Sequence, residues 1–318
     1  MNRVIQKAHL PRFFANLLNH FRVLGPTRKY GTTAHAYLSV GQVDNLEELE
    51  LEYENSAVAP KRLFLPDGEV LFGFSLVGEE VVLHSSKAAC ERPTLLFGLH
   101  PCDIAALQRL DRVFSELFND PYYDKKRSNT LIVGLTCNNP GEACFCNILG
   151  TGPDADSGYD LLMTDLGDRY FVRSATESGD ELLQAPYFRD ATLEDVLKRD
   201  STLKEAALAF RESFSIDGLK ERMGERYNDE LWDEYWRRCV TCGTCNMVCP
   251  TCHCFAILDK ANASDSEGKR VRVWDSCHFE RFARMAGGID FRAEKSSRFK
   301  HRLYDKFDYC RTRYNLVF

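Results

Sequence analysis

Six cysteines stand between residues 239 and 254, in the run Cys-Val-Thr-Cys-Gly-Thr-Cys-Asn-Met-Val-Cys-Pro-Thr-Cys-His-Cys. The first four, Cys239, Cys242, Cys245 and Cys249, follow the C-x2-C-x2-C-x3-C-P spacing of bacterial ferredoxins. A short loop with this spacing can bend three thiolates around one face of a cubane, and Gly243 lets the backbone approach the inorganic sulfides. Zinc sites favour two C-x2-C pairs with a longer spacer instead. The spacing therefore predicts a [4Fe–4S] cluster.

The same region offers more thiols than one cluster needs. In a two-cluster ferredoxin the fourth cysteine of a run binds the other cluster, but this chain has no second C-x2-C-x2-C run. The further candidate ligands are Cys252, Cys254, Cys277 and Cys310. A second cluster would use either these thiols or cysteines beyond residue 318, and the spacing does not assign the fourth ligand of either cluster.

Two apolar strands with a helix between them are predicted upstream. Residues 94–98 form the first strand, and a helix from 104 to about 118 follows, with Asp103 as its N-cap. Residues 130–136 form the second strand. Strand, helix and strand at this spacing predict a right-handed parallel crossover, in which both strands end at the same edge of the sheet.

Four cysteines follow these two strands. Cys102 comes after the first strand, Cys137 after the second, and Cys144 and Cys146 lie in the next loop. Because parallel strands end at one edge, we expect the four thiols to converge there and to bind a further cluster. The alternative is that some of them are small buried hydrophobic side chains. Cys90 has no such pattern, and we expect it to bind no metal.

The remaining pattern predicts two domains. Residues 1–215 read as a mixed α/β domain and residues 216–318 as a mainly helical, ferredoxin-like iron–sulfur region that lacks, or ends before, a second C-x2-C-x2-C motif. The supporting elements are an amphipathic helix before residue 24, β structure at 63–65, 70–74 and 81–83, a hairpin at 159–164 and 170–174, and helix over most of 193–238.

Composition narrows the class of protein. The chain has 318 residues, a net charge of −6 and a pI of about 5.8. This balance argues against a general affinity for nucleic acid, because nucleic-acid-binding proteins present a basic surface. No apolar run is long enough to span a membrane, and the first 24 residues lack the cleavage site of a signal peptide. We therefore expect a cytoplasmic protein whose 13 cysteines bind metal rather than form disulfides.

Several phrases resemble one family. It comprises the beta subunits of cytoplasmic NiFe (sulf)hydrogenases and the corresponding subunits of anaerobic sulfite reductases, with relatives in flavin oxidoreductase–heterodisulfide reductase complexes. The phrases are His100-Pro101-Cys102-Asp103-Ile104-Ala105-Ala106-Leu107, Asp120-Pro121-Tyr122-Tyr123, Cys137 through Cys144-Phe145-Cys146, Asp165-Leu166-Gly167-Asp168, Cys249-Pro250-Thr251-Cys252-His253-Cys254-Phe255 and Trp274-Asp275-Ser276-Cys277. The resemblance runs from about residue 60 to the end. Family members carry a second CxxCGxC run just after the position that matches Phe318, where this chain stops.

The resemblance implies a non-catalytic electron-transfer subunit. It would relay electrons between a flavin-containing, NAD(P)H-reactive subunit and a catalytic subunit, through two or three [4Fe–4S] clusters. We assign no nicotinamide or flavin site to this chain, because residues 150–153 are glycine-rich but lack the strand-to-helix context of a dinucleotide fingerprint.

Two other functions stay open on sequence grounds. The surplus thiols Cys252, Cys254 and Cys277 would also suit a catalytic cluster that acts on a thiol or disulfide. A zinc-stabilised scaffold that only binds partners is the second alternative. Residues 292–313 carry eight Lys or Arg and three Asp or Glu; we expect these charges to be solvated on a helix, with a docking face for an acidic partner as the alternative.

Overall fold

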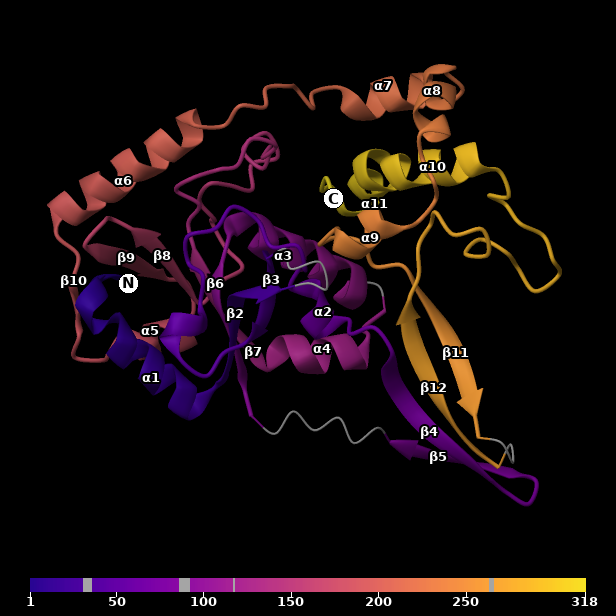
Figure 1. The fold of residues 1–318 in the computed structure, drawn as a ribbon, viewed down its shortest axis with the longest axis horizontal. Helices are drawn as coiled ribbons and strands as arrows, with labels where there is room; N and C mark the ends of the chain where they lie inside the picture. Colours follow the sequence, from indigo (N-terminus) through magenta and orange to yellow (C-terminus); the bar gives the residue numbers. More distant parts are fainter. Residues whose placement is uncertain (31–35, 86–91, 117, 263–265) are drawn as a thin grey trace. The chain divides into compact units, whose positions relative to one another are not determined.

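The computed structural model describes residues 1–30, 36–85, 92–116, 118–262 and 266–318 (Figure 1). The chain divides into two compact units. The first contains Met1–Pro60, Cys90–Asp111 and Asp124–Ile216, and the second contains Lys61–Ala89, Arg112–Tyr123 and Asp217–Phe318. The boundary between the two units passes through helices α3 (Pro101–Ser115) and α4 (Pro121–Ser128), so each helix has residues in both units.

The first unit is built on an eight-stranded sheet of order β10-β1-β9-β8-β7-β6-β2-β3. Its strands are β1 (Asn2–Gln6), β2 (Arg22–Tyr30), β3 (Ala36–Gln42), β6 (Thr94–Leu99), β7 (Thr130–Leu135), β8 (Leu161–Asp165), β9 (Arg169–Ser174) and β10 (Phe188–Asp190). Its other helices are η1 (Lys7–His9), α1 (Leu10–His20), η2 (Leu46–Glu48), α5 (Glu177–Leu182) and α6 (Leu193–Leu208). Strands β2, β6, β7 and β8 are parallel, and the others pair antiparallel.

The core of this unit forms between the sheet and helix α1. Phe13, Phe14 and Leu17 lie on one face of the helix and are almost fully buried, because apolar residues at helical spacing meet the apolar strands. The sheet contributes side chains such as Phe97 and Val133, which are also buried. Strands β6 and β7 are buried along nearly their whole length, as strands covered on both faces are. This rigid layer carries the loops that hold the upstream cysteines.

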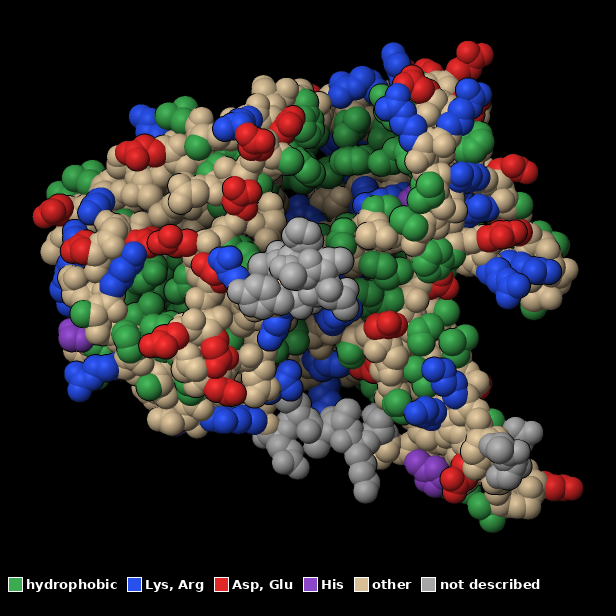
Figure 2. Space-filling view, in the orientation of Figure 1, with side chains coloured by type: hydrophobic (Ala, Val, Ile, Leu, Met, Phe, Trp, Pro, Cys, Tyr) green, Lys and Arg blue, Asp and Glu red, His purple; other side chains and the backbone are tan. Residues whose placement is uncertain are grey.

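The second unit contains a four-stranded antiparallel sheet of order β11-β12-β4-β5. Its strands are β4 (Glu69–Val77), β5 (Glu80–Ser85), β11 (Phe255–Ala261) and β12 (Glu267–Trp274). Its helices are α2 (Lys61–Phe64), α7 (Leu219–Glu225), α8 (Leu231–Arg237), α9 (Thr244–Val248), α10 (Lys295–Tyr304), the π-helical turn η3 (Asp305–Tyr309) and α11 (Cys310–Tyr314). Figure 2 shows apolar and charged side chains interspersed over these strands.

Most predicted elements are present. The parallel pairing of 94–98 with 130–136 is confirmed by β6 and β7, and the hairpin at 159–174 is confirmed by β8 and β9. The mixed α/β class is confirmed as well. The long helical stretch is divided into α6, α7 and α8.

Two local predictions are wrong. Residues 63–65 do not form a strand but complete and follow the helical turn α2, since three apolar residues are too few to show a period. Asp103 is not an N-cap, because α3 already begins at Pro101, a residue suited to the first helical position. The mainly helical, ferredoxin-like character of 216–318 stays a prediction; this stretch contributes β11 and β12 to the sheet as well as five α-helices.

Candidate metal centres

The parallel strands of the first unit bring four cysteines together; we call Cys102, Cys137, Cys144 and Cys146 the sheet-edge thiols. Cys102 lies in the first turn of α3, directly after β6, and Cys137 follows the end of β7 by two residues. Cys144 and Cys146 lie in the loop between β7 and β8. Each of the four thiols interacts electrostatically with the other three. The predicted convergence at one sheet edge is therefore present.

Burial governs the protonation of the sheet-edge thiols. It raises the pKa of Cys102 well above the ordinary value, and charge repulsion from Asp103 and the neighbouring thiols adds to this. Burial, followed by repulsion from neighbouring thiols, raises the pKa of Cys137 and of Cys146 to about 11. Four grouped thiols of this kind become thiolates only with a cation between them, which is the environment that an iron–sulfur core supplies.

The backbone of the loop approaches these thiols closely at two glycines. A Cβ atom added to Gly152 would lie 2.6 Å from Cys146 Sγ, and one added to Gly141 would lie 3.6 Å from Cys144 Sγ. Backbone hydrogen bonds hold the loop, from Thr151 N to Cys146 O at 2.9 Å and from Cys137 N to Pro153 O at 3.1 Å. The four thiols and this glycine-lined loop fit a cubane, which needs four thiolates and close backbone approach.

A histidine–tyrosine pair lies beside the sheet-edge thiols. The rings of His100 and Tyr53 stack with centroids 3.9 Å apart and an interplanar angle of 4°. The Tyr53 hydroxyl donates to Gly98 O at 2.8 Å and accepts from His100 N at 3.2 Å. Burial lowers the pKa of His100 to about 4, so its ring is neutral at pH 7. Tyr53 was not predicted as a residue of this site, and no motif around it in the sequence indicates such a role.

In the second unit, four thiols gather around helix α9. Cys245 interacts electrostatically with Cys277, Cys239 and Cys242, and burial raises its pKa. Cys277 is 5% exposed and its Sγ accepts a hydrogen bond from Asn246 Nδ2 at 3.0 Å. Cys277 follows strand β12, so a residue outside the C-x2-C-x2-C run completes a group of four.

Gly243 adopts the left-handed conformation that the ferredoxin-like loop requires. Its φ is +74°, and an added Cβ atom would lie 2.6 Å from the Phe279 ring. A side chain at this position would therefore be strained and would also clash. The predicted role of Gly243 in bringing the backbone close to the cluster is consistent with this geometry.

A second group of thiols follows α9. The thiol of Cys252 shares a hydrogen bond with Cys249, which lowers the pKa of Cys249 and raises that of Cys252. The thiols of Cys254 and Cys277 share another, which raises the pKa of Cys254 and lowers that of Cys277. Cys277 thus lies between the group around α9 and the group formed by Cys249, Cys252 and Cys254.

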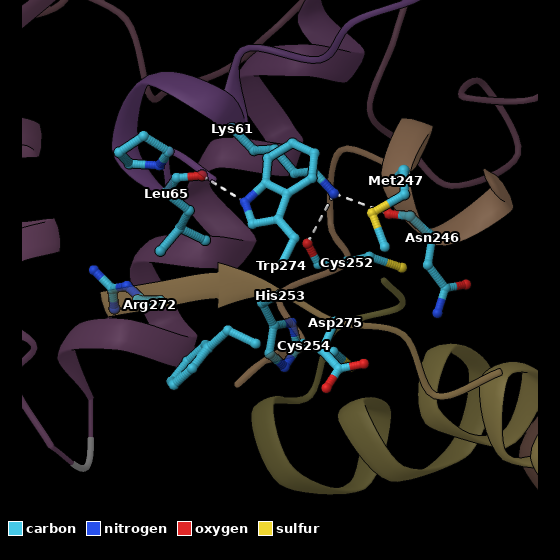
Figure 3. A pocket seen from close by; sticks show the side chains of 12 residues that line it. Lys61, Leu65, Asn246, Met247, Cys252, His253, Cys254, Arg272, Trp274 and Asp275 are labelled. Carbon is cyan, nitrogen blue, oxygen red and sulfur yellow. Dashed lines mark hydrogen bonds between the residues drawn. The ribbon is translucent and has the colours of Figure 1, made fainter. Parts of the chain in front are cut away.

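Three cations converge on the segment between Asn246 and Cys252. Lys61 Nζ donates to Asn246 O at 2.9 Å and to Cys252 O at 3.1 Å (Figure 3). Lys306 Nζ donates to the carbonyl and the hydroxyl of Thr251, both at 3.1 Å. Arg302 Nη1 lies 3.4 Å from Cys252 Sγ. The expectation that the charges of 292–313 are solvated is therefore wrong for Lys306, which is 6% exposed.

The two histidines near these thiols differ in what holds them. His253 Nδ1 lies 3.1 Å from Thr251 O, and its ring meets Phe114 edge to face, so it is held by the backbone and aromatic packing. His278 Nδ1 lies 4.0 Å from Cys239 Sγ, and its buried Nε2 has no hydrogen-bond partner among the described residues. His278 was missed from sequence, although it directly follows Cys277.

The described part of the chain contains no group of three or more His, Cys, Asp or Glu side chains close enough for a single metal ion. A cubane does not need such convergence, because each of its irons takes one thiolate. The 12 described cysteines are all free. Cys310 is buried and lies 3.8 Å from Asp305 Oδ1. Cys90 lies outside the described residues.

Ferredoxin-like spacing and grouped free thiols define the class of an iron–sulfur protein. A family model described as a 4Fe-4S dicluster domain matches residues 238–318. The chain is 33% identical over 304 residues to sulfhydrogenase 2 subunit beta of Pyrococcus furiosus. The aligned region covers 95% of this chain and 87% of that protein. The chain therefore belongs to the hydrogenase beta subunit family. A comparison with solved structures gave no significant match.

These findings support an iron–sulfur electron-transfer subunit that binds [4Fe–4S] clusters. Within the described residues, no helix is both long and apolar enough to cross a membrane.

Proposed function

We propose that this chain relays single electrons between a flavin-containing, NAD(P)H-reactive subunit and a catalytic subunit of a cytoplasmic redox complex. The observation that carries the proposal is the presence of grouped thiols in both units, in a chain of the hydrogenase beta subunit family. The 4Fe-4S dicluster model and the name of the relative, a subunit of a sulfhydrogenase, support an assembly of several subunits.

The proposed ligands fall into three groups. The sheet-edge thiols would hold one cluster, and Cys239, Cys242, Cys245 and Cys277 would hold a second. Cys249, Cys252 and Cys254 would contribute to a third. When bound, a [4Fe–4S] cluster accepts and releases one electron at a time, at a potential that burial, charge and hydrogen bonds to sulfur determine.

The protein's own residues would fix the ligands and shape their surroundings. Asn246 donates to Cys277 Sγ at 3.0 Å and Arg302 Nη1 to Cys252 Sγ at 3.4 Å, and hydrogen bonds to sulfur raise cluster potentials. Burial of Cys277 keeps water from this ligand. A ferredoxin-like arrangement of 216–318 belongs to the same proposal.

The test is a redox assay on the anaerobically purified chain. We expect dithionite to reduce it, and an artificial acceptor of higher potential, such as ferricyanide, to reoxidise it completely. The isolated chain should oxidise neither hydrogen nor NAD(P)H, and should not reduce disulfides. Turnover of any of these substrates by the isolated chain would contradict a pure relay and favour a catalytic role.

A further inference from the structure

Three cations in the second unit lie close to the thiols of Cys249 and Cys252. Lys61 is 3% exposed and Lys306 is 6% exposed, and Arg302 is half-buried. They come from α2, η3 and α10, so two of them are separated from Lys61 by more than 200 residues. A buried ammonium group costs several kcal/mol unless a negative charge or good hydrogen bonds compensate it. Three such cations close together therefore need a negative charge or good hydrogen bonds nearby.

The hydrogen bonds of these cations go to one short segment of chain. Lys61 binds the carbonyls of Asn246 and Cys252, and Lys306 binds Thr251 through its carbonyl and its hydroxyl. Arg302 Nη2 donates to Cys245 O at 3.2 Å, while its Nη1 contacts Cys252 Sγ. The three side chains thus surround the turn that carries Cys249 and Cys252.

Carboxylates compensate these cations only in part. Among the described residues, Asp305 lies 3.9 Å from Lys306 Nζ, and neither Lys61 nor Arg302 forms an ion pair. Arg272 lines the same pocket as Lys61 (Figure 3). It is different, because it pairs with Glu69 and Asp120. The protein thus neutralises the nearby arginine with two acids but leaves the cations at the thiols without equivalent partners.

Electrostatic coupling links the three cations to the same two sulfurs. Burial lowers the pKa of Lys61, and Cys252 and Cys249 only partly offset this. For Lys306 and Arg302, burial also acts to lower the pKa, but Cys252 and Cys249, together with other nearby thiols and with Asp305 beside Lys306, outweigh it and the pKa is raised. Cys249 and Cys252 are the two thiols that all three cations share.

We propose that Lys61, Arg302 and Lys306 form a charge-balancing cradle for an iron–sulfur cluster bound through Cys249 and Cys252, and that they raise its reduction potential. This inference rests on the proposed electron-transfer function. A cluster with its thiolates is an anion, and reduction adds one more negative charge. Nearby cations stabilise the reduced form more than the oxidised form, so their removal makes reduction harder.

The experiment is an EPR-monitored redox titration of the full-length chain, with iron counted on the same samples. Lys306→Gln and Lys61→Gln should each shift the midpoint potential of one cluster to a more negative value. Lys306→Arg and Lys61→Arg keep the charge and should stay close to the parent protein. Lys300→Gln is the matched control, because Lys300 lies on α10 but donates to Tyr227 O.

Each outcome decides the proposal. Loss of one cluster's iron in the glutamine variants, with iron retained in the arginine variants, would also support it, because charge would then be needed to hold the anion. Full iron with unchanged potentials in both glutamine variants would overturn it. Equal loss of iron in the glutamine and arginine variants would also overturn it, because shape would then matter rather than charge. Absence of labile sulfide from the parent protein would instead refute the electron-transfer function.

Discussion

At the scale of single residues, burial and charge decide what each thiol can bind. Burial raises the pKa of Cys137 and Cys146 to about 11, so without a metal these groups hold their protons at pH 7. Metal binding requires the thiolate and therefore releases protons. Grouped, buried thiols without disulfides are poor surface nucleophiles but suitable ligands for a cluster that brings its own positive charge.

The sheet-edge thiols provide a prediction at this scale. Cys146→Ala removes one of four proposed ligands, so we expect about four irons fewer per chain, because a cubane holds four. The EPR signals of the remaining clusters should persist. Iron analysis and EPR of the dithionite-reduced protein measure both effects.

Cys90→Ala is the matched control for this substitution, and we expect it to keep the full iron content. Equal iron content in Cys146→Ala and in the parent protein would show that the sheet-edge thiols hold no cluster. They would then be small buried side chains, the alternative that the sequence left open.

The cysteine ligands can be predicted from the sequence more readily than the side chains around them. The spacing of Cys239 to Cys249 is itself typical of a cluster-binding loop. By contrast, nothing in the sequence around a lysine indicates that the lysine is buried. Lys61 lies 185 residues from Asn246, to which it donates. Only the tertiary fold brings the two together, so no local pattern could have identified the cradle.

At the scale of elements, the first turn of helix α6 contains a buried acidic residue. Asp195 completes a capping box with Thr192 and is 1% exposed. It accepts hydrogen bonds from Arg169 Nε and Arg189 Nη1, both at 2.7 Å. The hydrogen bond from Arg189 is the main cause that holds the pKa of Asp195 well below its usual range. This network joins α6 to β9 and β10.

We predict that Asp195→Asn lowers the free energy of unfolding at pH 7 by about 3 kcal/mol, because it removes the negative charge and one of the two carboxylate oxygens that Arg169 and Arg189 share. A carboxyl with a depressed pKa in the folded state stabilises the fold above its unfolded pKa of about 3.9. That contribution is lost as the pH falls below this value. The difference between variant and parent should therefore shrink toward pH 3.

Urea unfolding followed by far-UV circular dichroism at pH 7 and at pH 3 measures this effect. Asp190→Asn is the control, because Asp190 pairs with Arg3 but is 86% exposed, and such pairs contribute less than about 1 kcal/mol. A difference between Asp195→Asn and the parent that did not change with pH would contradict the assigned protonation state.

Helices and strands could be predicted where the apolar residues recur with a clear helical period or form a run of strand length. Helix α1 shows its apolar face in the sequence, and β6 and β7 are apolar runs of strand length. The strands β11 and β12 were missed, because their sequences carry many charged residues and both faces of β11 are largely exposed. The pairing of β12 with β4 joins segments nearly 200 residues apart, which no local signal encodes.

At the scale of the whole molecule, the chain presents thiol groups in each of its two units. The first unit holds its thiols at the ends of two parallel strands, and the second holds them around a short helix and a strand end. If only the ferredoxin-like run bound metal, the sheet-edge thiols would have no role. In the proposed electron relay, each unit holds at least one cluster.

The most direct test of the proposed relay is the amount of iron, acid-labile sulfide and zinc per chain, measured on anaerobically purified protein. We predict about eight to twelve irons with matching sulfide, since each cubane holds four of each. EPR after dithionite reduction should show reducible cubanes. Zinc without labile sulfide would contradict the relay and leave a structural scaffold in place of an electron carrier.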